Sequence, residues 1–233
     1  MAPIITTARI VCKSKEARVT VTEAFHKIIQ FTQPHEPEVL RYMVTLPVED
    51  TTGTVLYMIE ECARRPLLSD HRPAHTEQIR ISRRKRRPHT TGPVQDLIKL
   101  FTTGDVLAQP PEVHVCPIIA SHNSSLVPRI SSNPAIVLAH FGYEMQTREK
   151  ALEGSKSIAE EMKKESGTKG FTVADDKEAS CVRTMVVYES WEAAESVHKG
   201  KEANIERGGT SGQGAVRVRA VDGFLGREER GKL

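Results

Sequence analysis

The sequence predicts an α+β fold made of two tandem ferredoxin-like split β-α-β units, with antiparallel sheets covered by helices. Residues 135–226 follow the order strand, helix, strand, strand, helix, strand. Segments 34–61 and 164–190 share one pattern: helix end, short strand, acidic turn, longer strand and a final acid. This internal repetition indicates that the order occurs twice. The chain of 233 residues is long enough for two domains of about 100 residues each.

In the first half, a short strand at 6–12 is followed by a helix from Ser14, which is placed to cap it. Apolar residues at near-helical spacing give this helix one face that can pack on a sheet. Pro34 is expected to end the helix, because proline cannot continue it. The remaining elements expected in this half are strands at 39–46 and 54–61, a helix at 93–101 and a closing strand at 113–117.

The second half has the clearer pattern. Its best helix is expected at 148–165, where an apolar stripe recurs at helical spacing and paired Glu and Lys residues face water. Residues 215–221 alternate strictly between apolar and polar, which is typical of a strand. The other expected elements are strands at 136–145, 169–175 and 182–189, a helix at 191–207 and a glycine-rich loop at 208–214.

Residues 1–117 and 135–228 are therefore expected to form two α+β domains, joined by a linker at 118–134. Helices cover one face of such a sheet, and the other face needs a partner sheet. A second copy on the same chain supplies that sheet. The tandem copies can thus close a pseudo-symmetric barrel as an intramolecular pseudo-dimer, and a homodimer is the alternative.

A basic, proline-rich insertion at 62–92 interrupts the first unit. Residues 64–89 carry nine basic and two acidic side chains, a net +7 that leaves −4 on the rest of a chain whose total is +3. The insertion has neither helical nor strand periodicity, and we expect it to be irregular. Its RRKRRP run, residues 83–88, is a nuclear localisation signal or acidic-surface tether, a solvated loop, or a gene-model artefact.

Composition and motifs exclude several classes of protein. The mildly acidic body gives no reason to expect a specific nucleic-acid partner. No apolar run is long enough to cross a membrane, and the N-terminus lacks a secretory pattern, so we expect a cytoplasmic protein unless the basic run directs it to the nucleus. The cysteines and histidines show no metal-ligand spacing, and no phosphate loop or Rossmann fingerprint is present. The four cysteines form no CxxC and indicate reduced thiols.

The second half resembles the antibiotic biosynthesis monooxygenase domain of the dimeric α+β barrel superfamily, in its fungal versions. The resemblance rests on four motifs in order: E-S-G-T, V-Y-E-S, a helix ending in a histidine, and a final G-F-L-G. They stand at residues 165–168, 187–190, 198 and 223–226. About 90 residues are covered well, and the first half is covered less well. The family is recognised by such a pattern and not by an invariant catalytic signature.

The resemblance implies oxidation of a phenolic or polyketide-type molecule by dioxygen in secondary metabolism, without metal, flavin or haem. Such chemistry needs a base near pH 7, donors that orient the ring, and an apolar pocket. The resemblance places that pocket between the sheet and the helices. His198 is the candidate base, with Tyr143 and Arg183 as further catalytic candidates. The predicted substrate-binding residues are Trp191, Tyr188 and Phe171.

Each of these residues also has an ordinary structural role open to it. Trp191 can line a pocket, although a place in the core is favoured, and the lysines beside His198 suit a surface position. His140 and Tyr143 belong to one strand but point to opposite faces, so at most one of them faces a pocket. The alternative function is a non-catalytic barrel module that binds a small aromatic ligand or mediates dimerisation. A haem-degrading relative is a weaker third possibility.

Overall fold

The computed structural model describes residues 2–63, 92–124, 128–199 and 213–227, and the basic run of the insertion lies outside these ranges. The predicted α+β fold is confirmed, because the order β-α-β-β-α-β occurs in each half. The first half contains β1 (Ile4–Val11), α1 (Lys15–His35), β2 (Val39–Pro47), β3 (Val55–Cys62), α2 (Gly92–Thr103) and β4 (Glu112–Asn123). The second contains β5 (Ala135–Gly142), α3 (Arg148–Met162), β6 (Thr168–Asp176), β7 (Cys181–Tyr188), α4 (Trp191–Lys199) and β8 (Gln213–Phe224).

The strands close into one barrel in the order β1-β3-β2-β8-β5-β7-β6-β4. The last strand of each half bridges to the other half. The first part of β4 pairs with β1 and its end, from Ile118 to Asn123, pairs with β6, while β8 pairs with both β2 and β5. The strand β4 therefore extends into the predicted linker. Each half depends on the other to close its sheet.

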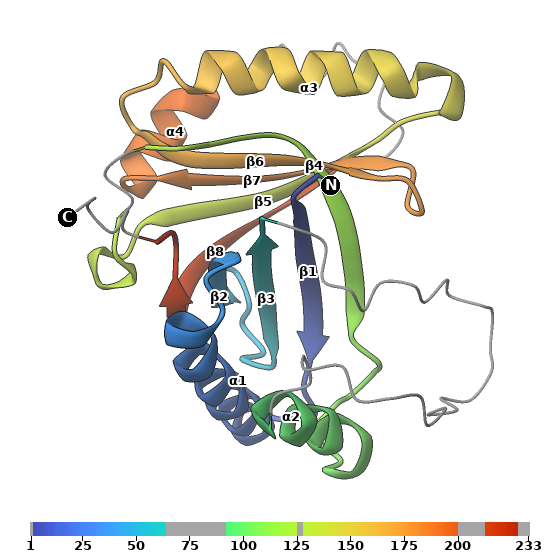
Figure 1. The fold of residues 1–233 in the computed structure, drawn as a ribbon, viewed down its shortest axis with the longest axis vertical. Helices are drawn as coiled ribbons and strands as arrows, with labels where there is room; N and C mark the ends of the chain where they lie inside the picture. The colour runs from blue at the N-terminus through green and yellow to red at the C-terminus, as the bar shows by residue number, and fades with distance from the viewer. Residues whose placement is uncertain (1, 64–91, 125–127, 200–212, 228–233) are drawn as a thin grey trace.

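The helices lie outside the barrel, with α1 and α2 on one side and α3 and α4 on the opposite side (Figure 1). The side chain of Ser14 caps α1 by accepting a hydrogen bond from the backbone N–H of Ala17 at 3.1 Å. This helix runs one residue past Pro34, because proline in the last turn removes only one hydrogen bond. One apolar cluster fills each space between helices and sheet, and a third fills part of the barrel interior.

A buried ion pair lies inside the barrel, between neighbouring strands. Arg41 on β2 and Glu61 on β3 are 1% and 3% exposed, and Nη1 of Arg41 lies 3.5 Å from Oε2 of Glu61. Both side chains also contact the second half. Arg41 donates to the carbonyl of Leu225 at 2.8 Å, and Thr172 donates to Glu61 at 3.2 Å. The pair therefore ties the two halves together.

None of the helices in the described part of the chain has the length and apolar character needed to cross a membrane.

Candidate functional site

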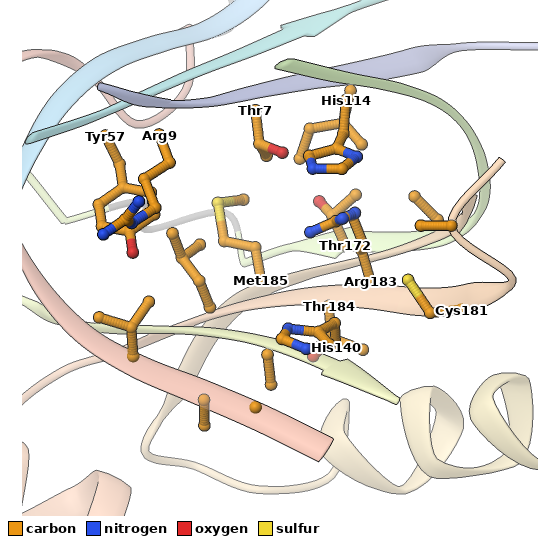
Figure 2. Close-up of a pocket in the computed structure, with 18 of the residues that line it drawn as sticks. Thr7, Arg9, Tyr57, His114, His140, Thr172, Cys181, Arg183, Thr184 and Met185 are labelled. Atoms are coloured by element: carbon orange, nitrogen blue, oxygen red, sulfur yellow. The ribbon is translucent and has the colours of Figure 1, made fainter. Parts of the chain in front are cut away.

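A cavity of about 590 Å³ lies inside the barrel, on the sheet faces opposite the helices (Figure 2). Side chains alternate along a strand, so residues two apart line the same space. On β1, Thr7 and Arg9 line the cavity, as do Leu138 and His140 on β5. Its volume falls in the range of small-molecule sites, which is about 300–1,000 Å³. The cavity is thus large enough for a molecule of two or three fused rings.

The two ends of the cavity are built from equivalent positions on the two halves. Arg9 on β1 is the cross-strand neighbour of Tyr57 on β3, and His140 on β5 is the neighbour of Arg183 on β7. The two pairs occupy equivalent positions in the two halves. Ile4 at the start of β1 pairs with the last residue of β3, and Ala135 at the start of β5 pairs with the last residue of β7. Arg9 and His140 each lie five residues after these starting points. Figure 2 shows the pairs on opposite sides of Met185. One end therefore carries an arginine and a phenol, and the other an arginine and an imidazole.

A chain of charged side chains runs between these ends. His114 on β4 lies 3.1 Å from Glu112 and 2.9 Å from Asp176, and Nε of Arg183 donates to Asp176 at 2.7 Å. Burial acts to raise the pKa of Asp176, but the hydrogen bonds from His114 and Arg183 outweigh it and hold that pKa well below its usual range. The hydrogen bond to Asp176 in turn raises the pKa of His114, against the opposing effect of burial.

Replacing His114 with glutamine should therefore change how stability depends on pH. A raised pKa in the folded state means that the contribution of His114 is fully present below about pH 6.5, its unfolded value, and is lost as the pH rises through the folded pKa. The difference in unfolding free energy between wild type and His114→Gln should shrink across that range in urea titrations. A difference that stays constant with pH would contradict the pairing.

His140 lines the cavity, and its side chain is exposed. Its imidazole makes no hydrogen bond to any other described residue. Burial by its surroundings, and next the positive charge of Arg183, lower the pKa of His140. The ring is therefore neutral at pH 7 and has a free nitrogen that can accept a proton.

Gly214 on β8 makes room for this imidazole. The two residues are cross-strand neighbours, and a Cβ at position 214 would clash with Cε1 of His140. A glycine is needed for this ring position because the ring comes so close to the backbone of β8; the φ angle of Gly214 itself is ordinary. The position of the His140 ring therefore depends on the absence of a side chain on β8.

The residues predicted from sequence divide between the two faces of the sheet. Arg183 lines the cavity. The other described candidates belong to the apolar cluster between the second sheet and its helices: Tyr143, Phe171, Tyr188 and Trp191. The hydroxyl of Tyr143 donates to Asp175 at 2.8 Å, so it is satisfied within that cluster. His198 falls in the last turn of α4, and its side chain lies outside the described part of the chain.

The described cavity therefore lies on the opposite face of the sheet from the predicted pocket. The sequence indicated His140 and Tyr143 as polar groups of which at most one faces a pocket, and it did not single out Arg9, Tyr57, Glu112 or His114 as site residues. Two polar alternations could have pointed to some of them: Thr7 with Arg9 inside the strand expected at 6–12, and Glu112 with His114 at the start of the strand expected at 113–117. Among the described residues, no three His, Cys, Asp or Glu side chains are grouped to hold a metal ion.

No family model matches the sequence, and no curated protein does. Solved structures share the fold. A candidate monooxygenase from Fusobacterium nucleatum is 14% identical with a TM-score of 0.74, and the match covers 98% of each chain. One from Lactobacillus acidophilus is 13% identical with a TM-score of 0.71, covering 97% of this chain and 98% of the other. An anthrone oxidase-like protein is 10% identical with a TM-score of 0.60, covering 100% and 98%. The chain therefore has the dimeric α+β barrel fold, with both halves on one polypeptide.

Proposed function

We propose that this chain is a monooxygenase-like enzyme that binds a small phenolic or polyketide-type molecule inside the barrel and oxidises it with dioxygen. One observation carries the proposal. A neutral imidazole with a free nitrogen, that of His140, stands beside the guanidinium of Arg183 at one end of a partly apolar cavity. An acid–base group next to a fixed positive charge suits the deprotonation of a phenol.

In this mechanism, His140 takes the proton from the phenolic hydroxyl and Arg183 stabilises the phenolate. The electron-rich ring then reacts with dioxygen at an activated carbon. For an anthrone, the ring methylene loses two hydrogens and becomes a carbonyl, which takes one oxygen atom, while the other oxygen atom leaves as water. The substrate supplies all the electrons that dioxygen accepts, so the reaction needs no redox cofactor.

The comparisons support the class of chemistry in a general way. Proteins that share the fold over nearly their whole length are described as candidate monooxygenases or as anthrone oxidase-like. The closed barrel formed by one chain supports an intramolecular pseudo-dimer as the working unit. We accordingly replace His198 and Tyr143 as the proposed catalytic residues with His140, and keep Arg183.

Oxygen uptake tests this proposal. Purified protein, with folding checked by circular dichroism, is mixed with a panel of phenols and anthrones in an oxygen electrode. We expect consumption of one dioxygen for each anthrone converted to anthraquinone. Binding without any oxygen uptake above the rate of the free compound would exclude the enzyme and favour the non-catalytic module.

Replacing Gly214 with alanine is expected to lower kcat/KM for such a substrate about tenfold or more, because a displaced base no longer meets the hydroxyl. The thermal midpoint should change little, because the site is half-buried and the ring has room to turn outward. Gly154→Ala is the matched control, since nothing lies within 4 Å of a Cβ added there. Equal kcat/KM for Gly214→Ala and wild type would contradict the role given to His140.

A further inference from the structure

The end of the cavity opposite His140 holds an arginine that the proposed mechanism does not use. Arg9 is half-buried and lines the cavity beside Tyr57. Its guanidinium makes no ion pair within 4.0 Å and no hydrogen bond to another described residue. The pKa of its cross-strand neighbour Glu112 is lowered, first by the hydrogen bond with His114 and to a smaller extent by the charge of Arg9. The hydrogen bond of the Glu112 carboxylate is with His114 and not with Arg9.

Charge alternates along the cavity from this arginine to the other. The order is Arg9, Glu112, His114, Asp176 and Arg183, and each neighbouring pair after the first is in contact at 2.7–3.1 Å. When His114 is protonated, this row has three cations and two carboxylates. One positive charge is thus left over, and Arg9 is the member without a direct partner.

One part of the wall between the ends is apolar. Leu138, Met185 and Val216 line it, and Met185 stands between the two polar ends in Figure 2. A flat ring system packs well against such side chains. The two halves have placed different polar groups at equivalent positions, so the cavity fits a ligand whose two ends also differ.

We infer that the ligand is an aromatic acid whose carboxylate binds Arg9 and Tyr57 while its phenolic hydroxyl faces His140 and Arg183. This inference rests on the proposed function and names the substrate class. Arginine binds a carboxylate through two parallel N–H donors, and the Tyr57 hydroxyl adds a third donor. A ligand carboxylate would also give Arg9 the ion-pair partner that it lacks among the described residues.

Calorimetry with two matched compounds tests the inference. 6-Hydroxy-2-naphthoate and its methyl ester share the ring and the hydroxyl but differ in charge. Wild-type protein should bind the acid about tenfold or more tightly than the ester, since a hydrogen bond to a charged group contributes about 1.5–3 kcal/mol. Arg9→Gln should lose this preference and leave the affinity for the ester unchanged, while Arg9→Lys should keep part of it.

Arg219→Gln is the control, because Arg219 is exposed on β8 and does not line the cavity. Its preference for the acid should equal that of wild type. Three results would overturn the inference. Wild type could bind the two compounds equally well, the preference for the acid could survive Arg9→Gln, or neither compound could bind. Oxygen uptake distinguishes a failure of this inference from a failure of the proposed function. A preference for the acid that depends on Arg9, without oxygen uptake, supports the ligand class and contradicts the oxidation. Oxygen uptake without a preference for the acid supports the oxidation and contradicts the ligand class.

Discussion

Replacing Arg41 with methionine is expected to lower the free energy of unfolding by about 3–5 kcal/mol, because it leaves Glu61 as an uncompensated charge in the barrel interior. The change also removes the hydrogen bond from Arg41 to the carbonyl of Leu225, which connects the first half to the second, and the hydrogen bond from Arg41 to Asn123. For a chain of this size, the thermal midpoint should fall by on the order of 10 °C. Chemical denaturation and calorimetry measure both quantities.

Two further variants sharpen this test. Arg41→Met combined with Glu61→Leu removes both charges and should recover much of the lost stability, as is common for buried pairs replaced by apolar residues. Lys13→Met, which removes an exposed partner of Asp105, should shift the midpoint little. A single Arg41→Met variant as stable as wild type would show that the pair does not hold the two halves together.

Replacing His140 with glutamine is expected to reduce kcat/KM for a phenolic substrate by about 100- to 10,000-fold, the contribution typical of a positioned general base. Glutamine is close to histidine in size and polarity but cannot take up a proton near pH 7. The thermal midpoint should stay near that of wild type, because His140 is exposed and contributes little to the core. Steady-state oxygen uptake measures the loss.

The pH profile shows whether His140 is the base. In wild type, kcat/KM should rise with pH as the imidazole loses its proton, and the midpoint should lie below the ordinary value of about 6.5, because burial and Arg183 favour the neutral ring. In His140→Gln this step should be absent. His35→Gln, an exposed change on α1, should keep both the rate and the step. A step that persists in His140→Gln would assign it to another group.

Local patterns in the sequence were sufficient to predict most elements. The stripe containing Val21, Phe25 and Ile28 identifies α1, and the strict alternation after Gly214 identifies β8. The exchange of β4 and β8 between the halves was not predictable in the same way. It depends on which sheet edges meet in space, and hydrophobic periodicity carries no information about that.

The location of the barrel cavity could not be predicted for the same reason. Alternation along the strand expected at 136–145 places His140 and Tyr143 on opposite sides, but it does not show which side encloses a cavity. That depends on the barrel interior, where Arg9 and His114 from the first half meet His140 and Arg183 from the second. Arg183 was selected from sequence as a polar residue on a strand, and its strand position places it on the inner face.

Nuclear magnetic resonance during a ligand titration tests the location of the site most directly. 6-Hydroxy-2-naphthoate is added to protein whose imidazole resonances are assigned with single His→Gln variants, and the indole of Trp191, the only tryptophan, is followed in parallel. A site inside the barrel predicts that His140 and His114 shift in a saturable manner while Trp191 stays unchanged. A saturable shift of Trp191 with unchanged His140 and His114 would place the ligand between the sheet and the helices and contradict the account.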